Sequence, residues 1–251
     1  MHYITLNKDN FISFHETPWN NFLFDGNTNE IDTFEFDTVE NGNKLISLFD
    51  DLCNVNTIKY SCIRIGGDNK NLKSILEDSN YKNVETSIKA ICNINQIPKN
   101  KLFNKFKFSI EPSTINDLKF IKNIAETEFK YGRFSEDSKV DTNHSKTRNS
   151  NWIDSLYEKS HLIVGKVDFN IFGFMAFDIK DTNANLVLGG VDSNYSYLAY
   201  PFWYAIFEKL KTMGVKNIDV MISASNIGIL NLYSKFGFKF SDTYFGYRKI
   251  R

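Results

Sequence analysis

The chain has 251 residues, of which 42% are hydrophobic, so it is long enough to bury one large core or two modest ones. Thirty basic residues balance thirty acidic ones, which argues against nucleic acid or an anionic membrane as a partner. The longest apolar run, residues 197–207, is too short to span a bilayer and contains Pro201, and no basic segment followed by an apolar one opens the chain. We therefore expect a cytoplasmic globular protein.

Three cysteines, Cys53, Cys62 and Cys92, are odd in number and lie at no metal-ligand spacing. This pattern predicts reduced, partly buried thiols in a reducing compartment, with no disulfide and no zinc site. We expect no metal.

A polar stretch at residues 93–107 interrupts the hydrophobic pattern and separates two halves. We place a boundary near residue 105, which gives one domain of residues 1–105 and a second of residues 106–251.

The second half opens with a predicted strand at residues 108–110 and a helix that Ser113 or Thr114 can cap. A polar segment at residues 131–151 precedes a short helix around residues 152–157. Three strands follow consecutively, which predicts an antiparallel meander. They lie at residues 161–168, 171–179 and 186–191.

The end of the chain holds two further helices. Pro201 and Gly214 bracket the first of them, and a short alternating strand follows it. In N-I-G-I-L-N-L-Y-S-K-F-G-F-K, residues 226–239, apolar side chains recur at helical spacing and Gly237 supplies the helix stop. An aromatic strand at residues 238–247 ends the pattern. The order predicts an α+β fold with one mixed, largely antiparallel sheet flanked by helices.

The first half contains a fainter copy of this ending. Residues 69–82, N-K-N-L-K-S-I-L-E-D-S-N-Y-K, align with residues 226–239 at a constant offset of 157, the difference between positions 69 and 226. Leu76 replaces Tyr233 in the copy, so the packing pattern repeats and the tyrosine does not. The sequence predicts an internal duplication.

From about residue 106 onward the chain resembles the GNAT superfamily of acyl-CoA N-acyltransferases, and the first half resembles a partial second copy of that fold. The order of elements carries the resemblance, together with S-A-S-N-I-G-I-L-N-L-Y-S-K-F-G-F-K at residues 223–239. Residues 17–27, 131–140 and 151–155 resemble, more narrowly, the acyltransferases of nucleotide-linked amino sugars such as the dTDP-fucosamine acetyltransferases, a class tied to O-antigen synthesis. Those enzymes also carry a partial N-terminal domain.

The resemblance implies an acyl-CoA co-substrate, acetyl-CoA or 3-hydroxybutyryl-CoA, and a tyrosine that protonates the leaving thiolate. Tyr233 stands at that position. A phenol has an ordinary pKa of about 10, so Tyr233 is protonated near neutrality and suits a general acid. Its place on an apolar helix face fits core packing equally well.

The other predicted CoA contacts come from the resemblance as well. Asn226 can cap its helix, bond the pantetheine arm, or do both. Gly189 and Gly190 can open a bulge that exposes backbone N–H groups around Val191 to the thioester oxygen, or can be a packing pair. The predicted contacts are Gly190, Val191, Asn194, Ser196 and Asn226.

The loop that holds the CoA diphosphate in the superfamily departs here from its glycine-rich form. Residues 192–201 read D-S-N-Y-S-Y-L-A-Y-P, and Pro201 has no N–H to donate. Either CoA binds in an altered pose, using Ser193, Asn194 and Ser196, or the domain has lost CoA.

The polar segment at residues 131–144 predicts a substrate lid, because it is longer than a compact domain needs. Arg133 can pair with a nucleotide phosphate, Tyr131 and Phe134 can stack on a base or sugar, and Asp137 can order the substrate amine. A solvated loop is the alternative for each.

Two other sets of side chains are candidates for a functional role. His144 on the predicted lid and His161 at a strand start have no partner at a telling spacing, so water is the expected proton acceptor. Trp19, with Phe22 and Phe24, is either a nucleotide-stacking edge or ordinary core.

The sequence thus predicts an N-acyltransferase that moves an acyl group from acyl-CoA to the amine of a dTDP-linked amino-dideoxy sugar by direct attack. Two alternatives stay open: a GNAT acetyltransferase acting on a peptide or small-molecule amine, and a noncatalytic binding module with this fold. An oligomer is compatible with all three.

Overall fold

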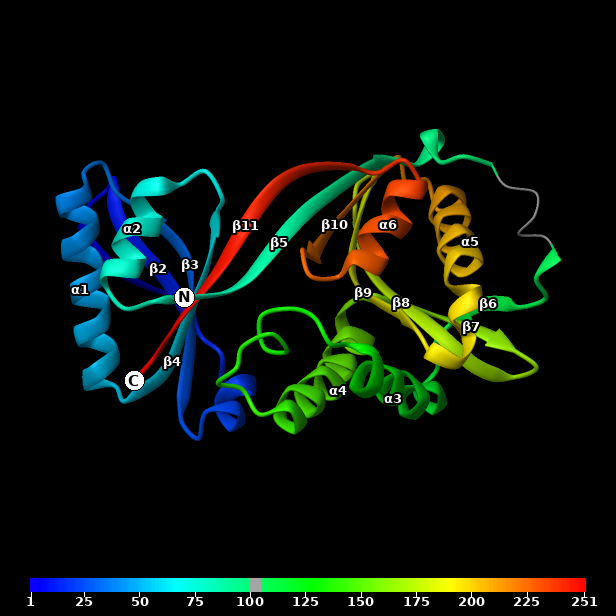
Figure 1. Cartoon of the computed structure of the whole chain (residues 1–251), viewed down its shortest axis with the longest axis horizontal. Coiled ribbons are helices and arrows are strands. Elements are labelled where there is room, and N and C mark those ends of the chain that lie inside the picture. Colours follow the sequence, from blue (N-terminus) through cyan, green and yellow to red (C-terminus); the bar gives the residue numbers. More distant parts are fainter. Residues whose placement is uncertain (100–104) are drawn as a thin grey trace. The chain divides into compact units, whose positions relative to one another are not determined.

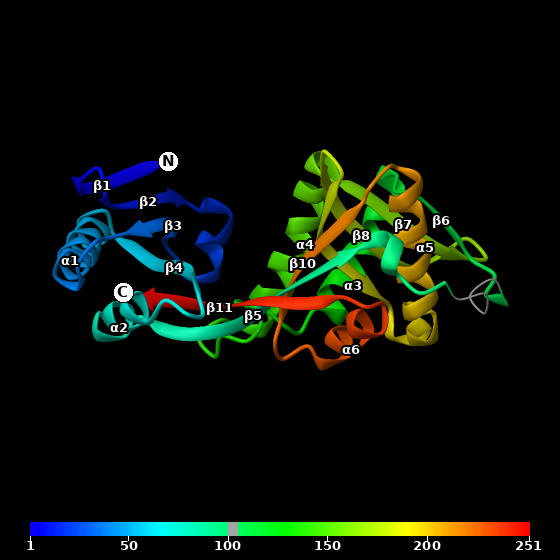
Figure 2. The same cartoon turned by 90° about the horizontal axis from the view of Figure 1, so that it is seen from above.

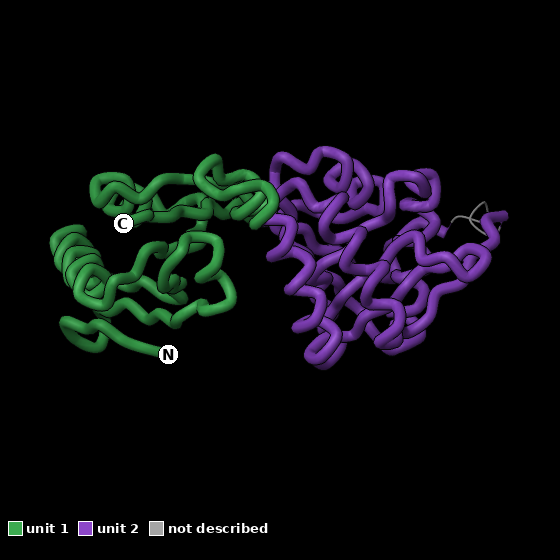
Figure 3. Tube along the Cα trace, turned by 90° about the horizontal axis from the view of Figure 1, so that it is seen from below, with its two compact units in different colours: residues 1–87, 132–144, 242–251 green, residues 88–131, 145–241 purple. Residues whose placement is uncertain are grey.

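The computed structural model describes residues 1–99 and 105–251 (Figure 1; Figure 2). Two compact units make up the chain, coloured separately in Figure 3. Unit 1 contains Met1–Ser87, Gly132–His144 and Asp242–Arg251, and unit 2 contains Ile88–Tyr131 and Ser145–Ser241. This division differs from the boundary predicted near residue 105, because two segments distant in sequence pack into unit 1. Residues 100–104 of the predicted boundary stretch lie outside the described part of the chain.

Unit 1 is a sheet with two helices. Its strands lie in the order β1-β2-β3-β4-β11, with β3 and β4 parallel and the other neighbours antiparallel. The helices α1 and α2 pack over a buried cluster that includes Ile12, Phe49 and Tyr247. The elements are β1 His2–Asn7, β2 Asn10–Glu16, η1 Pro18–Leu23, β3 Asn27–Glu35, α1 Val39–Val55, β4 Ile58–Gly66 and α2 Lys70–Asp78, with the start of β5 Lys82–Asn93 and the end of β11 Lys239–Ile250.

Unit 2 carries the remaining strands of the sheet, with helices on both faces. Its strands lie in the order β5-β10-β9-β8-β7-β6; the run β6 to β9 is antiparallel, which confirms the predicted meander, and β9 and β10 are parallel. The elements are η2 Ile94–Gln96, β6 Ser109–Pro112, η4 Ile115–Asp117, α3 Leu118–Glu128, α4 Thr142–Lys159, β7 His161–Val167, β8 Asn170–Lys180, β9 Asn183–Val191, η5 Ser193–Leu198, α5 Ala199–Thr212, β10 Asn217–Ser223 and α6 Ile227–Lys235. The predicted α+β class is confirmed.

The central strand β8 explains how the unit 2 core is built. Its residues 172–177 are buried without interruption, as expected of a strand covered on both faces. Phe174 and Ala176 join the cluster under α3 and α4, whereas Phe172 and Phe177 join the cluster under α5 and α6. Figure 1 shows these helix pairs on opposite sides of the strands.

The predicted internal repeat appears in the backbone. The bounds of α2 and β5 recur in α6 and β11 at the offset of 157 residues found in the sequence. Asn69 and Asn226 cap their helices in the same way, accepting the N–H of Leu72 at 3.1 Å and of Ile229 at 3.2 Å. The duplication therefore extends to the capping hydrogen bonds.

Both copies also end their helix in the left-handed region. Asn80 has a φ of 64° and Gly237 a φ of 81°, and glycine or asparagine is the usual residue for this conformation. The next residue returns an N–H to the helix: Tyr81 to the Leu76 carbonyl at 2.8 Å, and Phe238 to the Tyr233 carbonyl at 3.1 Å. The Gly237 stop predicted from the sequence is confirmed.

Helix α4 is longer than predicted. It runs Thr142–Lys159, whereas the sequence predicted a polar loop through residue 151. Asp141 accepts the N–H groups of Asn143 and His144 at 2.8 and 3.2 Å, which starts the helix ten residues earlier. The polar character of its first turns concealed it. No helix in the described ranges has the length and apolarity to cross a membrane.

Candidate active site

The parallel strands β9 and β10 pair over only part of their length. Residues 183–186 of β9 face residues 217–220 of β10, and the pairing ends at Leu186 and Val220. β9 continues to Val191 and β10 to Ser223 without further partners in each other. Two strand edges thus leave the ladder, and β9 leads through η5 into the start of α5. An extended amide-bearing ligand can hydrogen-bond to such edges.

A bulge accompanies this separation, at a different place from the predicted one. On the β8 side, Leu186 faces Phe177 and Leu188 faces Ala176, so Val187 is the extra residue. Gly189, Gly190 and Val191 keep regular partners in β8. Of the two roles predicted for the glycine pair, the structure shows close packing and not the opening of a bulge.

The glycine pair lies against two bulky side chains. A Cβ at Gly189 would come within 2.6 Å of Met175, and a Cβ at Gly190 within 3.0 Å of the Phe129 ring. Any larger residue would displace these neighbours from the core around β8.

The loop before α5 satisfies its own amides. Ser193 donates its N–H to Glu128 Oε1 at 3.2 Å, and Asn194 donates its N–H and Nδ2 to Asp192 Oδ1 at 2.8 and 2.9 Å. The Tyr195 N–H is donated to the Asp192 carbonyl at 2.8 Å. Asn194 and Ser196, two predicted CoA contacts, are exposed.

Asn226, at the start of α6, uses its side-chain oxygen to cap the helix at Ile229. The capping role is confirmed, and the pantetheine contact stays a prediction.

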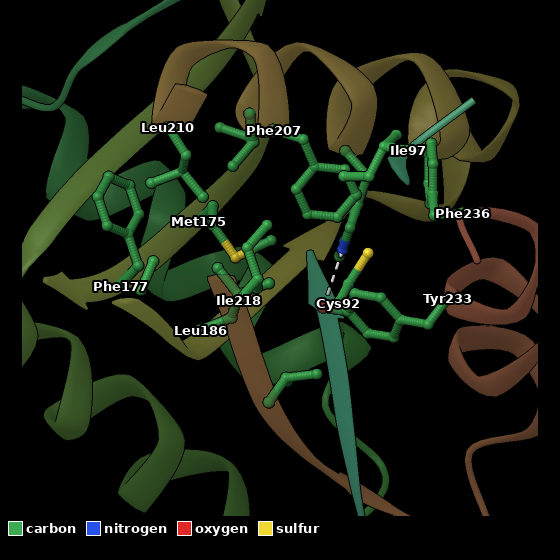
Figure 4. Close-up of a cluster of buried hydrophobic side chains, with 14 of the residues drawn as sticks. Cys92, Ile97, Met175, Phe177, Leu186, Phe207, Leu210, Ile218, Tyr233 and Phe236 are labelled. Carbon is green, nitrogen blue, oxygen red and sulfur yellow. Dashed lines mark hydrogen bonds between the residues drawn. The ribbon is translucent and has the colours of Figure 1, made fainter. Parts of the chain in front are cut away.

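Tyr233 lies in the interior of unit 2. Its side chain is 3% exposed and packs at 4.6 Å from the Phe238 ring, in a cluster that includes Cys92 and Phe207 (Figure 4). Its hydroxyl accepts a hydrogen bond from Trp203 Nε1 at 3.1 Å. Burial raises the pKa of Tyr233 well above its ordinary value, and the Trp203 hydrogen bond only partly offsets this. The hydroxyl is therefore a protonated phenol, held in the core and not open to solvent in this structure.

The predicted substrate segment is packed into unit 1. Arg133 donates from Nη1 and Nη2 to the Glu30 carboxylate at 2.8 and 3.1 Å, and from Nη1 to Cys62 Sγ at 3.1 Å. Phe134 is buried, with its ring 6.0 Å from that of Tyr60. A nucleotide phosphate would have to displace Glu30 to reach this guanidinium.

Asp137 forms a second buried ion pair. Arg248 Nε and Nη2 donate to its carboxylate at 2.8 and 3.1 Å, and the Asp137 side chain is 1% exposed. Tyr131, at the end of a unit 2 segment, is 45% exposed. Of the four predicted substrate residues, the structure thus leaves only the Tyr131 ring open to solvent and commits the charges of the two ionic ones.

The remaining candidates are distributed over both units. His144 lies at 6.0 Å from Phe22, and His161 stacks on Phe177 at 5.2 Å. Trp19 is 59% exposed, whereas Phe24 stacks on Tyr60 at 4.0 Å, as a core residue would.

The three cysteines are buried free thiols. Within residues 1–99 and 105–251, no group of three or more His, Cys, Asp and Glu side chains is arranged to hold a metal ion.

A scan against known protein families and a search of curated proteins find no match for this sequence. Among solved structures, a conserved protein of unknown function from Staphylococcus epidermidis is similar, with a TM-score of 0.68, 11% identity, and coverage of 100% of this chain and 94% of that one. A GCN5-related N-acetyltransferase from Sphaerobacter thermophilus has a TM-score of 0.66, 13% identity, and coverage of 96% and 76%. This chain has the GNAT fold.

A tandem GNAT protein from the clavulanic acid biosynthesis pathway is similar over both halves of the chain, with a TM-score of 0.61, 9% identity, and coverage of 89% of this chain and 75% of that one. Identities this low establish the fold alone. The structural neighbours thus agree with a GNAT fold that extends over both units.

Sequence reasoning missed three residues that hydrogen-bond to the predicted site residues of unit 2. Asp192 carried a local signal, since an Asp two positions before Asn194 is a common Asx-turn arrangement. Glu128 and Trp203 carried none, because their partners Ser193 and Tyr233 lie 65 and 30 residues away.

The Glu30 and Arg133 pair predicts an acid-sensitive unit 1. Burial opposes ionisation of Glu30, but the Arg133 charge and hydrogen bond outweigh it and lower the pKa of this carboxyl. Because the pKa of Glu30 is lower in the folded state, its ion pair stabilises the fold fully at pH values above the pKa of an unfolded glutamate, about 4.3. This stabilisation is lost as the pH falls through the pKa of the folded state. Denaturant titrations should show unit 1 losing stability below about pH 4.3.

Glu30→Gln should destabilise unit 1 by about 3 kcal/mol at neutral pH, because Arg133 is left buried without its partner. The further loss of stability at acid pH should be smaller than in the wild type, because the variant has no carboxylate to protonate at this position. Glu35→Gln, at the exposed end of the same strand, is the matched control. If the stability of Glu30→Gln fell with decreasing pH as steeply as that of the wild type, the acid sensitivity would belong to other groups.

Proposed function

We propose that the chain is an N-acyltransferase that moves an acyl group from a thioester to an amine. The observation that carries the proposal is the early separation of β9 and β10 beside the start of α5, within a GNAT fold. Pantetheine is an extended chain with two amides, and the strand edges that no longer pair with each other offer it hydrogen bonds of the kind a neighbouring strand would make.

The acyl donor of this proposal is acyl-CoA, carrying an acetyl or a 3-hydroxybutyryl group, and the acceptor is a dTDP-linked amino-dideoxy sugar. The sequence resemblance at residues 17–27 and 131–140 supports the sugar. Tyr131, Arg133, Phe134 and Asp137 are its proposed contacts, and binding then includes exchange of the Glu30 carboxylate for a substrate phosphate. A peptide or another small amine is the alternative acceptor.

The chemistry requires a neutral amine and a proton for the departing thiolate. We assign the proton to Tyr233, whose hydroxyl becomes available when its hydrogen bond with Trp203 opens. Backbone N–H groups next to Val187, on the bulged part of β9, are suited to the thioester carbonyl, because a bulge leaves its extra residue outside the ladder.

A noncatalytic binding module is the second candidate, and two observations favour it. The Tyr233 hydroxyl is buried, and the amides before α5 are occupied by Glu128 and Asp192. A module of this kind would bind an amine or a nucleotide sugar without releasing any thiol.

The two candidates differ in thiol release. We expect the purified protein, mixed with acetyl-CoA, 3-hydroxybutyryl-CoA or acetyl-pantetheine and a panel of dTDP-amino sugars, peptides and polyamines, to release thiol with at least one pair at about 1 s⁻¹ or faster. Mass spectrometry of the acceptor identifies the acylated product. Binding of an acceptor with no thiol release from any thioester would favour the noncatalytic module.

A further inference from the structure

The start of α5 is a helix N-terminus, a common place for anion binding, but no basic side chain precedes it in residues 192–198. A helix of 14 residues carries a partial positive charge at its first turn, which favours phosphate, but the Ala199 N–H is already donated to the Ser196 carbonyl. Here the residue before the helix, Leu198, gives no side-chain cap, and Pro201 removes one donor.

Two carboxylates already occupy the amides that lead into this helix. Glu128 projects from the last turn of α3 to the Ser193 N–H, and Asp192 holds both the backbone and side-chain N–H groups of Asn194. With the Tyr195 N–H donated to the Asp192 carbonyl, three successive amides are committed within the chain. A diphosphate placed here would lose these donors and face two negative charges.

The pantetheine arm of a CoA-type donor does not meet these two carboxylates. The edges of β9 and β10 beyond Leu186 and Val220 are free of each other, and the pantetheine arm is uncharged. The obstacle is therefore confined to the diphosphate end of the donor.

We propose that Glu128 and Asp192 are specificity-determining residues that exclude diphosphate groups from the start of α5, so that the acyl donor is recognised through its acyl and pantetheine portion alone. This inference rests on the proposed thioester site. The consequence is that the nucleotide of CoA adds nothing to affinity, and that an acyl-pantetheine borne on another carrier serves as well as acyl-CoA.

The wild-type protein gives the first test, by calorimetric titration with CoA, pantetheine and inorganic pyrophosphate. CoA and pantetheine should bind within about threefold of each other, and pyrophosphate should not bind. CoA binding at least about tenfold tighter than pantetheine would overturn the inference.

The double variant Glu128→Gln/Asp192→Asn gives the second test. Both replacements keep an acceptor oxygen for the amide hydrogen bonds and remove only the charge. CoA affinity should rise about tenfold, pyrophosphate binding should become measurable, and pantetheine affinity should stay unchanged. Glu126→Gln, on the same helix, is the matched control and should change none of the three. A double variant that melts like wild type yet gains no affinity for CoA or pyrophosphate would overturn the inference.

Failure of the proposed function is a separate outcome. If pantetheine binds neither the wild type nor the double variant, the proposed thioester site is wrong. Pyrophosphate then still tests the exclusion of diphosphate. Binding of pyrophosphate to the double variant alone supports the exclusion, and binding to neither protein or to both contradicts it.

Discussion

A chain that ends at Ser241 is expected to lose the folded structure of unit 1 while unit 2 stays folded. The ten residues removed include the part of β11 that pairs with β4, with Tyr244 to Ile250 antiparallel to residues 60–66. They also carry Tyr247, which is 1% exposed in the unit 1 core and donates its hydroxyl to Glu77 at 2.8 Å.

The same segment supplies three of the cations that neutralise buried carboxylates. Arg248 pairs with Asp137, while Lys249 and Arg251 both bind Asp50. Removing one partner of a buried pair costs about 3–5 kcal/mol, and deleting a buried aromatic ring costs about as much again. The summed loss is as large as the roughly 5–15 kcal/mol that holds a domain folded.

Hydrogen exchange with mass spectrometry tests this truncation segment by segment. Amides of β4 and α2 should exchange at the rate of unfolded peptide, whereas those of β8 should keep their protection. Tyr247→Phe, which keeps the ring and loses only the hydroxyl, is the control and should leave unit 1 folded. Protection of β4 in the truncated chain would mean that β11 adds little to the unit.

The truncation prediction depends on contacts that local sequence patterns do not encode. Periodicity and capping residues gave α6, its Asn226 cap, its Gly237 stop and the repeat at an offset of 157, because each depends on neighbours within a few residues. The same local logic predicted a substrate lid at residues 131–144, with a solvated loop as the alternative, since that segment is polar.

The structure buries the charges of this segment, for a physical reason that applies to the whole candidate site. Arg133 finds Glu30 at a separation of 103 residues, and Asp137 finds Arg248 at 111. A polar segment whose charges are matched at long range is buried, whereas one without partners is solvated, and composition alone is the same in the two cases. The site residues of unit 2 are subject to the same limit, because Trp203 decides where the Tyr233 hydroxyl lies.

Tyr233→Phe is expected to reduce thiol release by about 10²- to 10⁴-fold if the phenol protonates the departing thiolate. It should also destabilise unit 2 by about 1–3 kcal/mol, since the buried Trp203 N–H loses its acceptor. Activity therefore reports the hydroxyl as a proton donor, and stability reports it as the hydrogen-bond acceptor of Trp203. Both are measurable on one preparation, by thiol release at 25 °C and by denaturant unfolding.

Trp203→Phe separates the catalytic role from the structural one, because it removes the Trp203 N–H and leaves the Tyr233 hydroxyl in place. In this background the stability loss from Tyr233→Phe should shrink, since no orphaned N–H remains, and a double-mutant cycle gives the coupling. A catalytic hydroxyl predicts that Trp203→Phe keeps or raises activity, because the phenol no longer has to give up a buried partner before it reaches the thioester. If instead Tyr233→Phe loses stability and keeps full thiol release, the hydroxyl is a core acceptor, and the thiolate takes its proton from water admitted between β9 and β10.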